Sequence, residues 1–266
     1  MTDKTLVHYE LNDGVAILTL DDPPANTYTH EMMVQLDQAI VRARFDEEAQ
    51  VIVVTGAGEK FFCAGANIQM LSEVTPGFKY CFCLHANETL NRFEHTSKLV
   101  IGALNGHTVG GGLEIAMACD IRIARKDGGQ CGLPEVALGV LPGTGGTQRL
   151  VRIVGKSKAI ELMAGGDTFG FDRALELGLV NQLLEASDNA GFMAQVLDYA
   201  KTFTTPNKAV RAVGNIKRAV QSGAELPFES ALTLERELQQ QLFQSSDAGE
   251  GLAAYVEKRT AEFTGN

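Results

Sequence analysis

Apolar residues in the first two thirds of the chain follow the spacings of strands and helices in turn. Short apolar runs predict strands at residues 6–11, 15–20, 51–55, 99–104 and 121–124. The first two flank Asn12, Asp13 and Gly14, a sequence typical of a hairpin turn. Helices are predicted at residues 31–44, behind Thr29 as a possible N-cap, and at 78–95. This order of strands and helices favours an α/β core with a mainly parallel sheet.

The pattern becomes helical after Pro142. Helices are predicted at residues 143–154, 156–163 and 172–177, and one more strand at 179–184. From Gly191 onward every predicted element is a helix, at 192–203, 207–221, 228–243 and 248–263. One face of this tail carries Ala231, Leu234, Leu238 and Leu242, which indicates packing against the core or a partner subunit. We therefore expect an α/β core over residues 1–186 and a helical region over 187–266.

Composition narrows the class of protein. Of the 266 residues, 45% are hydrophobic and 21% are charged, as in ordinary globular proteins. No apolar run reaches the ~20 residues of a membrane span, and residues 1–5 contain no recognisable targeting signal. The net charge of −10 argues against nucleic acid as a partner, although a local cationic pocket for a phosphorylated ligand stays open.

The cysteines and histidines do not form a metal or disulfide pattern. The five cysteines include only one close pair, Cys81 and Cys83, which is neither a CxxC redox motif nor a zinc knuckle. We therefore expect the cysteines to be reduced thiols in a cytoplasmic protein. The five histidines are scattered and form no HExxH motif, so no metal site is expected.

Two glycine-rich segments are candidates for binding through backbone amides. Residues 61–68 read FFCAGANI, a loop of small side chains that would let a ligand approach backbone N–H groups. Residues 105–114 read NGHTVGGGLE, in which three glycines lead into a predicted helix and suit an oxyanion or phosphate. The second segment is neither GxGxxG nor a P-loop, which excludes those dinucleotide and NTP motifs.

Two glutamates adjoin the glycine-rich segments. Glu114 ends the second segment, and Glu135 follows Pro134 in an apolar stretch before the run GVLPGTGGT at 139–147. Burial would raise the pKa of such a carboxyl toward the range of acid–base catalysis. A single glutamate is more often a surface or capping residue, and whether the two converge is left open by the sequence.

Taken together, these motifs resemble the enoyl-CoA hydratase/isomerase (crotonase) superfamily. The shared marks are an FxAGADI-like loop at 61–68, GGGxE at 110–114, the Pro-Glu pair at 134–135 and GxxPGxGGTQRL at 139–150. The resemblance continues to the ending AYVEKR at 254–259 and covers nearly the whole chain. It implies a crotonase-like β-β-α spiral core with a C-terminal helical region.

The resemblance also implies roles for individual residues. The amides of Ala66 and Gly111 match the family's oxyanion hole for a thioester carbonyl. Glu114 matches the glutamate that deprotonates the water added at C3, and Glu135 matches the proton donor to C2. No metal or redox cofactor is implied, because coenzyme A is part of the acyl-CoA substrate.

Coenzyme A contacts are implied at three places along the chain. The matching positions are Ala25 in the first loop, the segment Ala64, Ala66, Asn67 and Ile68, and the pair Tyr255 and Lys258. The last two are expected to reach the site from a neighbouring subunit. Asn67 stands where Asp is common, and Leu133 stands where Gln often precedes the Pro-Glu pair.

The leading hypothesis is an enoyl-CoA hydratase, a hydro-lyase of fatty acid β-oxidation that adds water reversibly and syn to a 2-enoyl-CoA. Alternatives are an isomerase, a decarboxylase or a specialised hydratase of branched or acidic enoyl-CoA. An RNA-binding relative is disfavoured because residues 29–48 hold only two basic residues, Arg42 and Arg44. A non-catalytic scaffold is disfavoured by the presence of both glutamates. A homo-oligomer is expected, a trimer or a hexamer built from two trimers.

Overall fold

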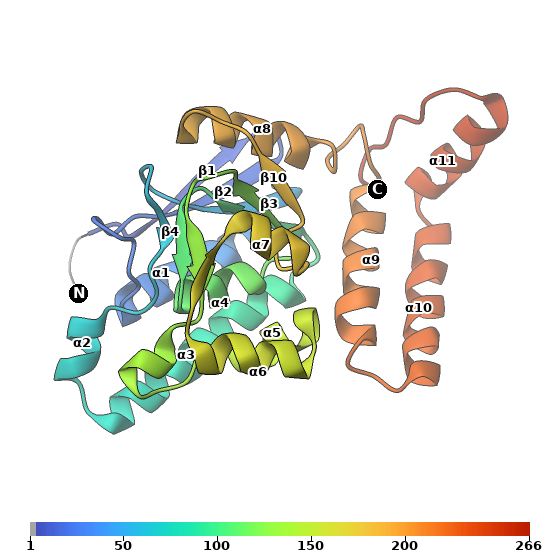
Figure 1. The fold of residues 1–266 in the computed structure, drawn as a ribbon. Coiled ribbons are helices and arrows are strands. Elements are labelled where there is room, and N and C mark those ends of the chain that lie inside the picture. Colours follow the sequence, from blue (N-terminus) through green and yellow to red (C-terminus); the bar gives the residue numbers. More distant parts are fainter. Residues whose placement is uncertain (1–3) are drawn as a thin grey trace.

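The computed structural model describes residues 4–266, and its core is built around a six-stranded sheet (Figure 1). Residues 1–3, part of the segment in which we expect no targeting signal, lie outside the described residues. The strand order is β1-β2-β3-β5-β7-β10. β1 is antiparallel to β2, and every other neighbouring pair is parallel, which confirms the predicted mainly parallel core. The strands are β1 (Val7–Asn12), β2 (Val15–Leu20), β3 (Val51–Gly56), β5 (Leu99–Leu104), β7 (Ile121–Arg125) and β10 (Gln182–Leu184).

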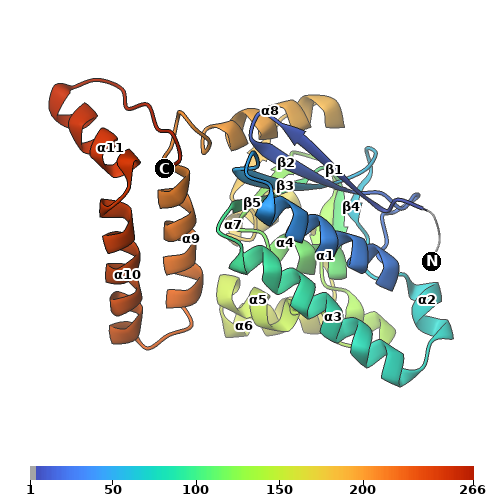
Figure 2. The same ribbon diagram turned by 180° about the vertical axis from the view of Figure 1, so that it is seen from behind.

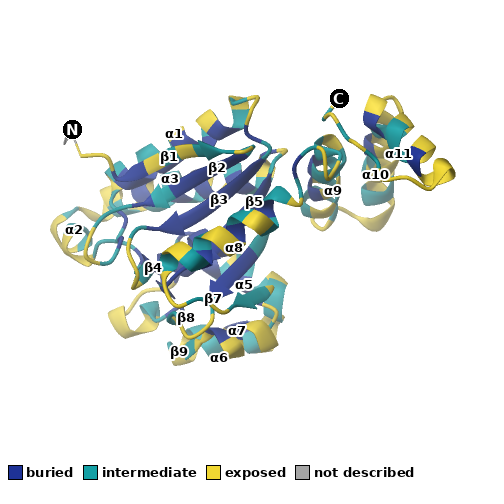
Figure 3. Cartoon of the chain, turned by 90° about the horizontal axis from the view of Figure 1, so that it is seen from above, coloured by how far each residue is buried: buried dark blue, intermediate teal, exposed yellow. Residues whose placement is uncertain are grey.

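Both faces of the large sheet are covered, so its central strands are buried (Figure 3). Along β2, Ala16 and Leu18 pack in the hydrophobic cluster with α1 (His30–Phe45), α3 (Pro76–His95) and α4 (Gly111–Met117). Val15 and Ile17 point the other way and pack against α8 (Asn189–Lys201). Side chains alternate across a strand, which is why these runs are apolar at every position.

A second sheet of four short strands was not predicted from the sequence. Its order is β4-β6-β8-β9, with β9 antiparallel to β8 and the other pairs parallel. Each strand has three residues: β4 (Phe61–Cys63), β6 (His107–Val109), β8 (Gln130–Gly132) and β9 (Thr168–Gly170). The glycine-rich segment at 105–114 therefore contains a strand, β6, and α4 begins within its three glycines, at Gly111. Three residues are too few to show a period of two.

Short helices fill the segment between the second sheet and the last strand of the large one. They are α2 (Ile68–Glu73), the 3₁₀ helix η1 (Glu135–Leu138), α5 (Gly146–Val154), α6 (Lys156–Gly165) and α7 (Phe171–Glu176). The strand predicted at 179–184 is shorter than expected. The amides of Leu179 and Val180 both donate to the Ala174 carbonyl at the end of α7, so only residues 182–184 pair with β7.

The last three helices project from the core as a separate layer (Figures 1 and 2). They are α9 (Val210–Gly223), α10 (Phe228–Phe243), which packs along α9, and α11 (Ser246–Glu257). The helix predicted to reach residue 263 ends at Glu257, where Lys258 has a φ of +57°. The chain then folds back, and the amides of Thr264 and Gly265 donate to the Asp247 carboxylate. Of the region 187–266, α8 packs on the sheet, whereas α9–α11 form the projecting layer.

Two further observations concern membrane-spanning helices and the cysteines. Within residues 4–266, no helix combines the length and the apolar character that crossing a membrane requires. All five cysteines are free, and Cys63, Cys119 and Cys131 are buried.

Candidate active site

The second sheet brings together the four residues for which the sequence implies catalytic roles. Ala66 follows β4, Gly111 and Glu114 follow β6, and Glu135 follows β8. These three strands are parallel, so their carboxyl ends meet at one edge of the sheet. A Cβ atom added at Gly65 would lie 3.1 Å from the Gly111 nitrogen, and one added at Gly110 would lie 2.9 Å from Glu135 Oε1. The predicted residues therefore converge.

The amides of Ala66 and Gly111 are available as hydrogen-bond donors. Tyr28 pairs with the residues on either side of Ala66: its N–H donates to Gly65 O (2.9 Å), and its carbonyl accepts from Asn67 N (2.9 Å). Gly111 is the first residue of α4, where an amide has no partner within the helix. Neither amide has an acceptor within residues 4–266. Unpaired N–H groups of this kind are the donors from which oxyanion holes are built.

Glu114 is buried, with 2% of its surface exposed, and it is held by two backbone amides. Its Oε1 accepts from Thr144 N at 2.7 Å and from Gly146 N at 2.6 Å, both at the start of α5. Burial raises the pKa of Glu114 to about 7, and the nearby Glu135 carboxylate adds to the rise. The hydrogen bonds from Thr144 and Gly146 oppose it. The carboxyl is thus poised to exchange a proton near neutral pH.

Glu135 has a different environment. It begins η1 directly after Pro134, and its Oε2 is buried without a hydrogen-bond partner in the described part of the chain. Burial raises the pKa of this carboxyl, which favours the protonated form. Two carboxyl groups held in unlike environments can divide the acid and base roles between them.

Two glycines are required here by close packing rather than by backbone conformation. A Cβ atom at Gly112 would lie 2.0 Å from the Cys63 carbonyl oxygen, because α4 packs directly on β4. A Cβ atom at Gly146 would lie 2.9 Å from Glu114 Oε1. The glycine runs of the sequence therefore mark the places where backbone approaches backbone and where the carboxylate is held.

Two of the segments predicted to contact coenzyme A, the loop that contains Ala25 and the segment at 64–68, also lie side by side. Ala64 N donates to Ala25 O at 3.0 Å, and Ile68 is exposed at the start of α2. Asn67 stands at the motif position where Asp is common, and its side chain caps α2 by accepting from Met70 N at 2.9 Å. Asn26, a residue with no recognisable sequence signal, is buried and donates its side-chain amide to Ala57 O and Phe61 O. This clamp fixes the first loop against β4.

Tyr255 and Lys258 lie outside this cluster. Both belong to the end of α11, which lies at the opposite side of the molecule from α2 (Figures 1 and 2). Tyr255 is 86% exposed. Within a single chain these residues do not reach the glutamates, and their expected role across a subunit boundary stays a prediction.

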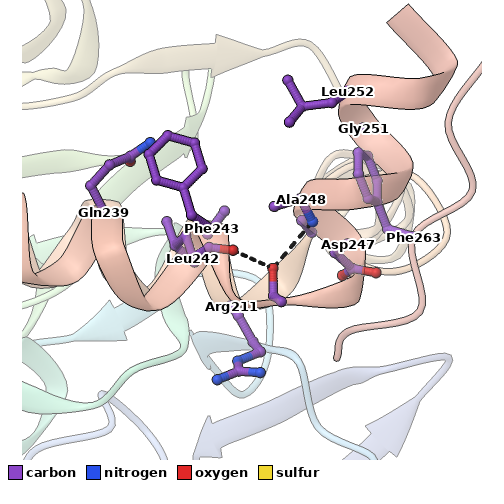
Figure 4. Close-up of a pocket in the computed structure, with 12 residues that line it drawn as sticks. Arg211, Gln239, Leu242, Phe243, Asp247, Ala248, Gly251, Leu252 and Phe263 are labelled. Carbon is purple, nitrogen blue, oxygen red and sulfur yellow. Dashed lines mark hydrogen bonds between the residues drawn. The ribbon is translucent and has the colours of Figure 1, made fainter.

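A cavity in the C-terminal helices is also separate from the carboxylates (Figure 4). Its walls include Leu242, Phe243, Leu252 and Phe263, and Ser245 links α10 to α11 by donating to Leu242 O and accepting from Ala248 N. It contains none of the predicted site residues. No group of three or more His, Cys, Asp and Glu side chains within residues 4–266 is placed to hold a metal ion.

Besides Asn26, three residues around Glu114 and Gly111 were not identified individually from the sequence. Thr144 and Gly146 lie in the glycine-rich run that was singled out, but nothing in that run indicated that their amides hold Glu114. Tyr28 is buried beside Gly111 and comes from a loop with no recognisable pattern. Its hydroxyl lies 3.0 Å from Thr144 Oγ1.

The fold and this arrangement of residues agree with comparisons to known proteins. The sequence model of the enoyl-CoA hydratase/isomerase family matches residues 10–266. The chain is 37% identical over 256 residues to the short-chain-enoyl-CoA hydratase of Clostridium acetobutylicum, with 95% of each chain covered. It is 32% identical over 255 residues to the crotonyl-CoA hydratase of Syntrophomonas wolfei, with 96% of each covered.

Solved structures agree with the sequence relatives. An enoyl-CoA hydratase from Geobacillus kaustophilus superposes with a TM-score of 0.94 and 42% identity, covering 100% of this chain and 98% of the other. The enoyl-CoA hydratase from Bacillus anthracis gives 0.91 and 28%, covering 98% and 100%. The chain therefore belongs to the enoyl-CoA hydratase/isomerase family, and the family and crotonase fold predicted from the sequence are confirmed.

Proposed function

We propose that this protein is an enoyl-CoA hydratase, a hydro-lyase that adds water reversibly and syn to a 2-enoyl-CoA to give a 3-hydroxyacyl-CoA. The observation that carries the proposal is the convergence of the buried Glu114 and the half-buried Glu135 beside two unpaired amides. Its relatives named as hydratases support the same activity. Both glutamates are present, whereas many isomerases and decarboxylases of the family retain only one.

The proposed reaction uses each group for one step. The amides of Ala66 and Gly111 receive the thioester oxygen and stabilise the negative charge that develops on it. Ionised Glu114 takes a proton from water as the water oxygen bonds to C3. Protonated Glu135 gives its proton to C2, so atoms and charge balance. Glu114 then holds the proton taken from water, and Glu135 is ionised. Transfer of a proton from Glu114 to Glu135 restores both groups before the next turnover.

The same proposal includes the coenzyme A contacts, the oligomeric state and the location of the enzyme. Coenzyme A enters as part of the substrate, with contacts at Ala25, Ala64, Ala66, Asn67 and Ile68. Tyr255 and Lys258 come from a neighbouring subunit of a homo-oligomer, a trimer or a dimer of trimers. The enzyme works in the cytoplasm on fatty acid β-oxidation intermediates, and it requires no metal ion, redox cofactor or nucleic acid.

The test replaces each glutamate by the isosteric amide. Glu114→Gln and Glu135→Gln should each fold as the wild type does and lose most of the hydratase rate. The double variant should lose far less than the product of the two losses, because both groups act in the addition of one water molecule across one double bond. The assay follows the absorbance of the conjugated enoyl thioester of crotonyl-CoA, and the product is identified by chromatography.

Two outcomes would contradict the proposal. Near-normal turnover by either single variant would remove that glutamate from the mechanism. A wild-type product with a shifted double bond, or release of carbon dioxide from an acidic acyl-CoA in place of hydration, would favour the isomerase or decarboxylase alternative.

A further inference from the structure

Tyr28 connects the parts of the site that come from distant segments. It follows β2, precedes α1 and is 2% exposed. Its backbone pairs with the segment around Ala66, donating to Gly65 O and accepting from Asn67 N, both at 2.9 Å. The direction of the Ala66 amide is therefore fixed by the backbone of Tyr28.

The Tyr28 ring packs against the second unpaired amide. A Cβ atom at Gly111 would lie 2.1 Å from the Tyr28 hydroxyl oxygen and 2.5 Å from Cε1. Glycine at this position lets the ring lie directly against the first turn of α4. Phe82 supports the ring from α3, with the two ring centroids 5.8 Å apart.

The Tyr28 hydroxyl reaches Glu114 through one intermediate. It lies 3.0 Å from Thr144 Oγ1. Thr144 in turn holds Glu114, because its amide donates to Oε1 at 2.7 Å. In the bond between the two hydroxyls either oxygen can be the donor. The Tyr28 hydroxyl thereby holds the side chain of the residue whose amide binds the carboxylate.

We propose that Tyr28 is a positioning residue of this hydratase site, which holds Thr144 in the place from which its amide donates to Glu114. The inference rests on the proposed function and adds a residue to it. A hydrogen bond to the Thr144 side chain restrains the whole residue, so its loss lets the Thr144 amide shift and weakens its bond to the carboxylate. Tyr28 acts through Thr144 and exchanges no proton with the substrate.

The charged surroundings of Glu114 explain why such neutral donors matter. The titratable groups that act on it are Glu135 from η1, Tyr28 from the first loop and Cys83 from α3. From α5, Arg149 donates to Thr144 O at 3.2 Å, but its guanidinium is paired with Glu94. Burial and Glu135 raise the pKa of Glu114, and the hydrogen-bond donors at Thr144 and Gly146 offset part of that rise. Loss of the Tyr28 hydroxyl should raise it further.

The test is Tyr28→Phe, which keeps the ring and removes only the hydroxyl. We expect kcat for hydration of crotonyl-CoA to fall roughly three- to tenfold, the scale of one net hydrogen bond. KM should change by less than about twofold, because the hydroxyl acts on Glu114 rather than on the substrate. The acid limb of the kcat/KM profile should move to higher pH. Tyr9→Phe is the matched control, because the Tyr9 hydroxyl bonds Asp46 on another part of the molecule; its kinetics should equal those of the wild type.

A double-mutant cycle separates positioning from general packing. Thr144→Val removes the intermediate hydroxyl, and Thr144→Ser retains it. If Tyr28 acts through Thr144, Tyr28→Phe should add no loss in the Thr144→Val background and its full loss in the Thr144→Ser background. Equal losses of Tyr28→Phe in both backgrounds, or an unmoved acid limb in Tyr28→Phe, would overturn the proposal.

One measurement is independent of turnover. The carboxylate titration of Glu114, taken as the infrared difference between each protein and its Glu114→Gln counterpart, should shift to higher pH in Tyr28→Phe. An active wild type with no such shift would refute the role of Tyr28 alone. An inactive wild type in which the shift is present would refute the hydratase function and leave the Tyr28–Thr144–Glu114 chain supported.

Discussion

The Glu114 carboxyl is subject to opposite demands from folding and from the proposed chemistry. Burial disfavours its charge, and the neighbouring Glu135 disfavours it further, so its pKa rises from 4.5 to about 7. As the proposed base it must nevertheless be ionised. The amides of Thr144 and Gly146 offset part of the cost. Ionising this group at working pH therefore lowers the stability of the fold.

This cost predicts how stability depends on pH. Because the pKa of Glu114 is raised in the folded state, the folded chain binds the extra proton between pH 4.5 and 7. The stabilising contribution is complete below pH 4.5 and is lost as the pH rises through 7. The loss is on the order of 3 kcal/mol, which Glu114→Gln should not show.

Urea unfolding at pH 5 and pH 8, at one protein concentration, measures the effect. Glu114→Gln should gain stability relative to the wild type on going from pH 5 to pH 8, whereas the exposed control Glu47→Gln should not. The same difference between Glu114→Gln and wild type at both pH values would show that burial does not perturb this carboxyl.

At the residue scale, the sequence predicts the site residues that belong to a recognisable motif. It does not predict the residues that reach the site only through the packing of distant segments. Ala66, Gly111 and Glu114 stand in glycine-rich segments, and Glu135 stands in a Pro-Glu pair just before another, so all four belong to recognisable motifs. Tyr28 lies beside Gly111 because the loop after β2 pairs with the segment after β4, far along the chain. No local pattern encodes that pairing, so its role is visible only in the fold.

At the scale of elements, length decides what can be predicted. The strands of the large sheet and the long helices carry enough apolar residues to show their period, and their positions were predicted within a few residues. The strands of the second sheet have three residues each, and β6 stands immediately before the glycines of α4. The sheet that positions the site was thus the part of the fold that periodicity could not predict.

The attachment of α9 to the core depends on a buried ion pair. Lys217 Nζ lies 2.8 Å from Asp120 Oδ2 and donates to Phe93 O and Lys98 O, at 2.6 and 3.0 Å. Both side chains are largely buried. Removing one partner of such a pair leaves the other charge uncompensated, at a cost of about 3–5 kcal/mol.

We therefore expect Lys217→Met to destabilise the fold by about that amount and to expose residues 202–209, between α8 and α9, to proteolysis. Lys217→Met combined with Asp120→Asn should recover much of the loss, because no unpaired charge remains. Urea unfolding and timed proteolysis give the two measurements. A single variant as stable and as resistant as the wild type would show that other contacts hold α9.

At the scale of the whole molecule, the projecting helices leave large apolar side chains uncovered. On α9–α11 the exposed ones include Ile216, Val220, Phe228, Phe243 and Leu252. Exposed apolar surface of this kind usually marks an interface. A homo-oligomer built through this layer would cover these residues, and it would allow α11 of one subunit to approach the site of another.

The final prediction tests oligomerisation and shared sites together. Light scattering after size-exclusion chromatography should give a trimer or hexamer. If Lys258 contacts coenzyme A as proposed, Lys258→Ala should raise KM for the acyl-CoA. If that lysine serves a neighbouring subunit, oligomers that mix Lys258→Ala with the inactive Glu114→Gln should regain sites with the wild-type KM. In such sites an intact Glu114 of one subunit meets an intact Lys258 of the other. Oligomers formed from each variant alone should show no such recovery, and they are the control. A monomer, or mixed oligomers with only the activity of Lys258→Ala, would contradict a site completed by a second subunit.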